Sequence, residues 1–126
     1  MESSYSIHPE QNLINMRASG VLTVDGLIDL IIRAGKDPAF RPSMNAVADL
    51  RDCVGNWDYS EIQRYRDFIV HIAGSQQRRW AAVVKPGTLV AVVHITILIS
   101  HEVQHLIEME LFDEPEKALR WATGTG

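Results

Sequence analysis

The sequence contains a single cysteine, Cys53, so no disulfide can form within one chain. The N-terminal segment MESSYSIHPEQN has neither a basic nor an apolar region, and therefore does not resemble a secretory signal peptide. The longest apolar run, 89–99, is interrupted by His94 and Thr96 and is shorter than the roughly 20 residues needed to cross a bilayer. We therefore expect a cytoplasmic protein without a transmembrane segment, in which 89–99 forms a buried core helix.

The chain also lacks an excess of positive charge. It has 12 lysine and arginine against 16 aspartate and glutamate residues, for a formal net charge of -4. The only tight basic pair, Arg78 and Arg79, lies between presumed core segments, so nucleic acid is not expected as a partner. The length of 126 residues and the 46% share of hydrophobic residues predict one domain that folds alone, with 1–4 and 123–126 as frayed ends.

The segment 45–50, NAVADL, is the stretch around which the rest of the chain is organised. Its apolar residues form a nearly continuous run, with Pro42 before it and Gly55 after it as turn residues. Such a run is typical of a strand that is covered on both faces. We expect it to be the central strand of an α/β domain.

Strands and helices alternate around this segment. A hairpin is predicted from 5–7 and 13–18, and the further strands are 80–84 and an alternating, edge-like 106–112. Right-handed crossovers between successive strands then give a mixed, largely parallel sheet with about four helices packed on it.

Capping residues predict where the helices begin. Thr23 starts a helix that ends near Gly35, and two overlapping capping boxes, Asp58 with Glu61 and Ser60 with Gln63, precede a helix that ends near Gly74. A third helix spans 88–102. For the last helix, we expect Asp113 as the N-cap, Glu116 as its capping-box partner, and Ala118, Leu119 and Ala122 facing inward.

Residues 101–105 spell H-E-x-x-H, a helical zinc signature in which Glu102 would activate water. Both histidines bind one metal only if the helix continues through His105, because they must lie one turn apart. The strand 106–112 follows too closely for that, and a third ligand is hard to find. We therefore predict no metal site and keep a zinc hydrolase built on His101, Glu102 and His105 as the alternative function.

Other single residues are better explained by structure than by chemistry. His94 is expected in the core or at an interface, donating to a backbone carbonyl. Cys53 lies beside Asp52, which disfavours a thiolate, so we interpret it as structural. The tryptophans are expected to serve packing.

Two stretches carry a family resemblance. KDPAFRPSMNAVADLRD (36–52) and LFDEPEKALRW (111–121) resemble the signature stretches of SpoIIAA-like proteins, STAS-like domains related to anti-sigma-factor antagonists and often described as STAS/SEC14 domain-containing. The resemblance covers nearly the whole chain in element order. It implies a single STAS-like α/β domain that serves as a non-enzymatic interaction module.

In the antagonists, a serine at the start of the helix after the central strand is phosphorylated. The comparable segment here is 58–61, which lacks the Asp-Ser pair and the glycine of that pattern. The resemblance therefore leaves a phosphorylation switch at Ser60 open, while Ser60 as a plain N-cap is the interpretation we favour.

Ligands of open α/β sheets bind beyond the carboxyl ends of parallel strands, where helix N-termini present free N–H groups. The predicted ligand-binding residues at this edge are Asp49, Arg51, Asp52, Trp57, Tyr59 and Ser60 after the central strand, and Lys85, Gly87 and Thr88 after the next strand.

We conclude from the sequence that the protein binds a protein partner or a small apolar or anionic ligand. The SEC14 part of the resemblance points to lipids, and no cofactor is expected. Because the helix from Thr88 offers little polar surface, a second copy of the chain is a candidate cover for it.

Overall fold

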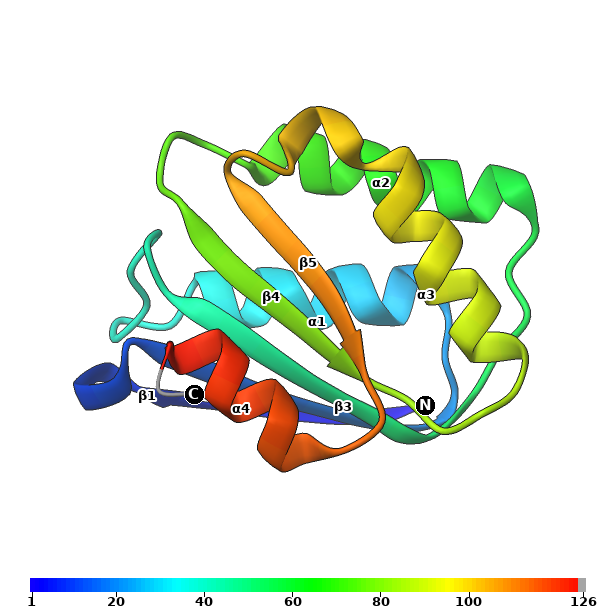
Figure 1. Ribbon diagram of the computed structural model, residues 1–126, viewed down its shortest axis with the longest axis horizontal. Coiled ribbons are helices and arrows are strands. Elements are labelled where there is room, and N and C mark those ends of the chain that lie inside the picture. The colour runs from blue at the N-terminus through cyan, green and yellow to red at the C-terminus, as the bar shows by residue number, and fades with distance from the viewer. Residues whose placement is uncertain (125–126) are drawn as a thin grey trace.

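Five strands form one sheet in the order β1-β2-β3-β4-β5 (Figure 1), in a computed structural model that describes residues 1–124. β1 (Glu2–His8) and β2 (Leu13–Val21) form an antiparallel hairpin, joined by a short 3-10 helix, Pro9–Gln11. β3 (Asn45–Val54), β4 (Arg78–Val83) and β5 (Ile107–Phe112) continue the sheet in parallel with β2. The predicted hairpin, central strand and largely parallel sheet are confirmed, and β5 lies at an edge as expected.

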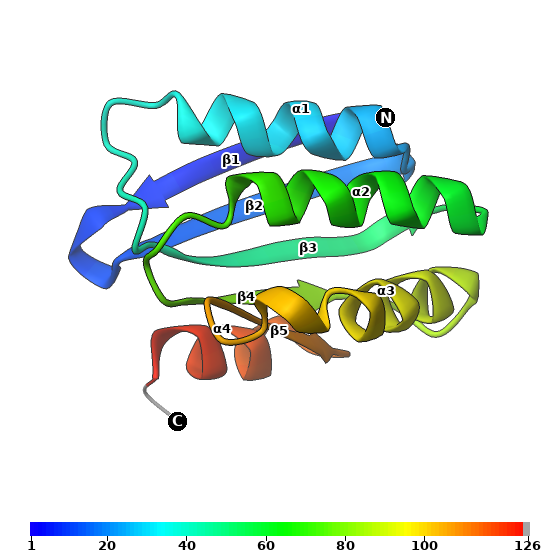
Figure 2. The ribbon, with the colours of Figure 1, turned by 90° about the horizontal axis from the view of Figure 1, so that it is seen from above.

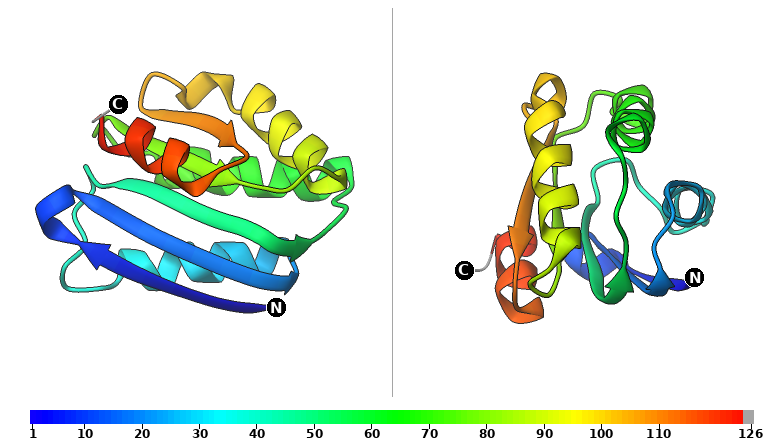
Figure 3. Two further views of the ribbon diagram at one scale, coloured as in Figure 1. Left: turned by 60° about the horizontal axis from the view of Figure 1, so that its bottom comes forward. Right: turned by 90° about the vertical axis from the view of Figure 1, so that its right-hand side faces the viewer.

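Helices cover both faces of the sheet. α1 (Val24–Gly35), α2 (Tyr59–Ile72) and α3 (Thr88–Ile99) form a layer on one face. α4 (Pro115–Thr123) lies on the other face, against β3, β4 and β5, as the turned views show (Figures 2 and 3). Within residues 1–124, no helix is long and apolar enough to span a bilayer.

The side chains of β3 alternate between these layers. Ala46 and Leu50 face the layer of α1, α2 and α3, whereas Val47 packs with Leu13 and Ala118 beneath α4. A strand covered on both sides has to be apolar at consecutive positions, which explains the run that marked it in the sequence.

Two helix starts follow the predicted caps, and one capping box does not form. The Thr23 hydroxyl accepts a hydrogen bond from the Gly26 N–H at 3.0 Å, and Asp58 and Glu61 form the expected box at the start of α2. The box of Ser60 with Gln63, and with it Ser60 as the N-cap, is wrong. Ser60 lies inside the first turn, where its hydroxyl donates to Asp58 Oδ1 at 2.7 Å.

The start of α4 also differs from the prediction. Its N-cap is Glu114, without a side-chain cap hydrogen bond, because Pro115 is the first helical residue and leaves Asp113 one position too early. The inward prediction holds for Ala118 and Ala122, which lie one turn apart and are buried. It is wrong for Leu119, which is 37% exposed because it lies beside that face of the helix.

α3 is not the fully buried helix that its composition predicted. It ends at Ile99, three residues before the expected Glu102, and is followed by a separate 3-10 helix, His101–Val103. One face packs inward through Leu89 and Val92. The opposite face is open to solvent, because a single layer of helices buries only one side of each helix. The exposed residues on that face are Ala91, His94, Ile95 and Leu98. His94 therefore does not lie in the core, and its alternative place at an interface stays a prediction.

Candidate functional site

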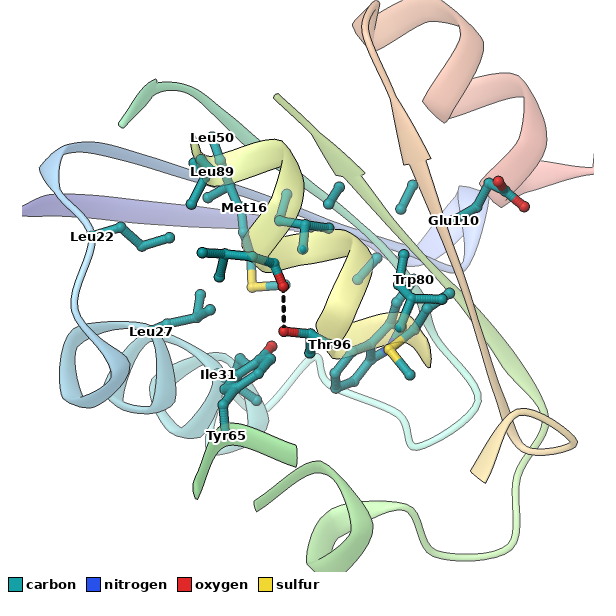
Figure 4. A pocket seen from close by; sticks show the side chains of 18 of the residues that line it. Met16, Leu22, Leu27, Ile31, Leu50, Tyr65, Trp80, Leu89, Thr96 and Glu110 are labelled. Atoms are coloured by element: carbon teal, nitrogen blue, oxygen red, sulfur yellow. Dashed lines mark hydrogen bonds between the residues drawn. The ribbon is translucent and has the colours of Figure 1, made fainter. Parts of the chain in front are cut away.

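Two apolar cavities lie between the sheet and the layer of α1, α2 and α3. The smaller one, about 90 Å³, lies beneath α3 and is seen from close by in Figure 4. The larger one, about 510 Å³, lies between the C-terminal parts of α1 and α2. Four side chains are shared by the walls of both cavities, which are therefore neighbours: Met16, Ile31, Ala46 and Trp80.

The smaller cavity offers little polar chemistry. The Trp57 indole N–H donates to the Leu22 carbonyl at 3.0 Å, and its ring meets Tyr65 edge to face at 5.6 Å. The Thr96 hydroxyl donates back to the Val92 carbonyl of its own helix at 2.8 Å, the bond that is dashed in Figure 4. Burial raises the pKa of Tyr65, which keeps its phenol neutral. This space suits hydrocarbon rather than a charged group.

The larger cavity has apolar walls with a cation among them. Phe40, Met44 and Phe68 contribute apolar surface, and Arg78 lies where the chain passes from α2 into β4. The Arg78 guanidinium lies over the Trp80 ring, 5.7 Å from its centroid. The volume falls within the roughly 300–1,000 Å³ that is typical of small-molecule sites.

The predicted ligand-binding residues after β3 are divided between the two faces of the sheet. Arg51 pairs with Asp49 at 2.8 Å and holds the pKa of that carboxyl below its ordinary value. Asp52 pairs with Arg17 at 2.8 Å. Trp57 instead faces the smaller cavity under the helices. The charged groups at this point are thus engaged with one another, and the tryptophan serves packing as expected.

The remaining predicted residues lie at the starts of α2 and α3. Tyr59 is 58% exposed, and Ser60 belongs to the cap of α2. Lys85 and Gly87 are exposed in the turn before α3, and Thr88 is the first residue of that helix. The fold therefore supplies the two helix starts on which the prediction rested.

The cavities were not predicted from the sequence, although the sequence contains one signal for them. β3 and β4 carry alanines where buried strands usually have larger branched residues, and Ala46, Ala48 and Ala82 line the smaller cavity. Small side chains beneath helices leave volume that neighbours must fill. The partners across that volume come from other parts of the chain, so the pattern alone does not reveal whether it is filled.

The H-E-x-x-H segment, residues 101–105, does not form a continuous helix through His105, as expected from the strand that follows so closely. The 3-10 helix ends at Val103, and His105 follows in a turn, so the two histidines do not lie on successive turns of one helix. Glu102 forms an ion pair with Arg66. Among the described residues, no group of three or more potential ligand side chains could hold a metal ion. The zinc hydrolase alternative therefore has no support in this geometry.

Comparisons with known proteins identify the fold. No family model matches the sequence, and no curated protein matches it. Among solved structures, the chain is similar to an uncharacterized protein of the DUF3478 family from Shewanella loihica PV-4, described as having a SpoIIAA-like fold. The match has a TM-score of 0.61 and covers 95% of this chain and 93% of that chain, at 15% sequence identity. This chain has a SpoIIAA-like fold.

The sequence resemblance left a phosphorylation switch at Ser60 open, and Ser60 is the second residue of α2, the helix that follows the central strand. Its hydroxyl donates to the Asp58 carboxylate, and the Glu61 side chain accepts from the Asp58 N–H at 3.2 Å. A phosphate on Ser60 would lie beside these two carboxylates and be repelled by them. The local structure thus explains Ser60 as part of the cap of α2.

Proposed function

We propose that this protein is a cytoplasmic, non-enzymatic STAS-type binding module that holds a small apolar ligand between its sheet and helices α1, α2 and α3. The single observation that supports this function is the cavity of about 510 Å³, which adjoins the smaller cavity through Met16, Ile31, Ala46 and Trp80. Burial of an apolar ligand there would contribute about 25 cal/mol for each Å² of apolar surface removed from water.

Titration of the delipidated protein with dodecan-1-ol tests this function. We expect the methyl resonances of Met16, Ile31 and Ala46 to shift together and to saturate, because these side chains line both cavities. Inorganic phosphate, added separately, tests the predicted anionic contact at Tyr59 and Lys85. If dodecan-1-ol does not shift the resonances of the cavity residues, the proposed function is contradicted. If phosphate does not shift the resonances of Tyr59 and Lys85, these residues do not belong to the binding site.

The exposed face of α3 supports a second proposal, that two copies of the chain associate through it. No charged residue occurs in Thr88–Ile99, and Leu98 is 65% exposed. A second copy presents the same uncharged helix, so a two-fold contact removes both faces from water at once.

We expect the wild-type protein to sediment as a dimer at micromolar concentration and Leu98→Glu to sediment as a monomer, because the charge would be buried in the contact. Val54→Glu is the matched control, since Val54 is 64% exposed but lies at the end of β3. It should remain dimeric. A monomeric wild-type protein in sedimentation equilibrium would rule out this association.

A further inference from the structure

Arg78 is the only charged residue among the described side chains that line the larger cavity. Most of the other arginines are paired with carboxylates, as Arg17 is with Asp52 and Arg79 with Glu108. No carboxylate within residues 1–124 forms an ion pair with Arg78. A cation without a counter-ion therefore lies at the wall of a cavity whose other lining residues are uncharged.

Backbone carbonyls hold the Arg78 guanidinium in place. Nη1 donates to the carbonyl oxygens of Ala73 and Gln76, each at 2.7 Å, and Nη2 donates to that of Ile72 at 3.3 Å. These contacts come from the end of α2 and the turn that follows it. Because the ring of Trp80 lies beneath the guanidinium, the group is fixed in orientation as well as in position.

These contacts leave part of the guanidinium free. Arginine has five N–H donors, and the three bonds above use both hydrogens of Nη1 and one of Nη2. Among the described residues, the Nε–H and the second N–H of Nη2 of Arg78 have no acceptor. The Nε–H and one N–H of Nη2 share one edge of the guanidinium, and this edge can bind a carboxylate through two parallel hydrogen bonds.

The charge of Arg78 is only partly offset by its protein contacts. The end of α2 supplies about half a negative charge through its dipole, less than the full charge of the guanidinium. Burial lowers the pKa of Arg78, since solvent stabilises the charged form less well there, yet arginine stays protonated at neutral pH. An anion at the free edge would therefore find a charged and preorganised partner.

We propose that the ligand of the larger cavity is a single-chain carboxylate, with its hydrocarbon chain between α1, α2 and the sheet and its carboxylate on Nε and Nη2 of Arg78. This inference rests on the proposed function, which supplies the site for the chain. One cation with one free edge matches one monoanionic head group.

The test compares dodecanoic acid with dodecan-1-ol, which has the same chain length but a neutral head group. At pH 7, the wild-type protein should bind dodecanoate roughly tenfold more tightly or better, because charge-assisted hydrogen bonds add to the same apolar burial. Arg78→Gln should reduce this preference to about onefold while its affinity for dodecan-1-ol stays within about twofold. Calorimetry on the delipidated full chain measures each affinity.

Arg79→Gln is the matched control. Arg79 is the next residue of β4, and its side chain lies against Trp121 and Glu108 on the α4 side of the sheet. This variant should keep the wild-type preference for dodecanoate. If it loses the preference as Arg78→Gln does, the effect is one of overall charge, and the inference is wrong.

The outcomes separate the two proposals. If neither compound binds, the proposed function fails. If both bind the wild-type protein equally, the carboxylate inference fails and the proposed function stands. Should Arg78→Gln fail to fold, a pH series on the wild-type protein decides, because dodecanoic acid loses its charge below about pH 4. Below that pH, the wild-type protein should bind dodecanoic acid and dodecan-1-ol equally well. If it still prefers dodecanoic acid, the inference is wrong.

Discussion

Leu13→Ala is expected to lower the free energy of unfolding by about 2–5 kcal/mol, the range typical of a leucine removed from a packed core. Leu13 is fully buried at the start of β2 and packs with Val47, Ala118 and Ala122. The alanines of α4 cannot expand into the space that the leucine leaves. A domain of this size is stable by about 5–15 kcal/mol, so the variant should unfold at clearly lower urea concentration.

Leu119→Ala makes the same chemical change at a partly exposed position and serves as the control. Leu119 is 37% exposed on α4, so its loss should cost less than about 1 kcal/mol. Dodecan-1-ol affinity should be unchanged in folded Leu13→Ala, because Leu13 packs beneath α4 on the face opposite the cavities. Equal destabilisation by the two variants in urea unfolding would contradict this description of the core.

Ala46→Leu should lower the affinity for dodecan-1-ol by roughly tenfold or more, since a steric clash of about 1.4 kcal/mol already has that effect. Ala46 is 2% exposed and its side chain lines both cavities. In the sheet it is paired with Ile14 on one side and Trp80 on the other. A leucine there would project into the volume that the ligand is proposed to fill.

The same substitution should change the free energy of unfolding by less than about 1.5 kcal/mol, because the added methyl groups enter existing space instead of a filled core. Ala39→Leu, in the exposed loop between α1 and β3, controls for the added apolar surface and should leave binding unchanged. Calorimetry measures the affinity of the folded Ala46→Leu variant for dodecan-1-ol. If this affinity equals that of the wild-type protein, the ligand does not bind in these cavities.

Helix starts were predicted correctly where the capping contact is local in the sequence, and exposure was predicted wrongly where it depends on distant elements. The helix starts at Thr23 and Asp58 could be predicted because each cap contacts a residue three positions away, as in the bond from the Glu61 N–H to Asp58 Oδ1 at 2.8 Å. Asp113 is not the cap because Pro115, two residues further on, sets where α4 begins. The exposure of His94 and Leu98 was not predictable, because it depends on which elements lie beside α3.

The candidate site could be predicted only in part. The two helix starts beyond β3 and β4 were foreseen from the alternation of strands and helices. The cavities require Met16, Ile31, Ala46 and Trp80 to meet, and these side chains come from β2, α1, β3 and β4. The distances between these four side chains depend on how the layer of helices packs on the sheet. No local sequence pattern specifies this packing.

The order of the elements, the hairpin, and the central strand with apolar residues facing both layers all follow from the sequence, because these features depend on periodicity and on contacts between near neighbours. The tertiary structure alone decided the exposed face of α3, the cavities beneath the helices, and the orientation of Arg78 against the end of α2. These features result from packing between distant segments, and their energies depend on which side chains meet.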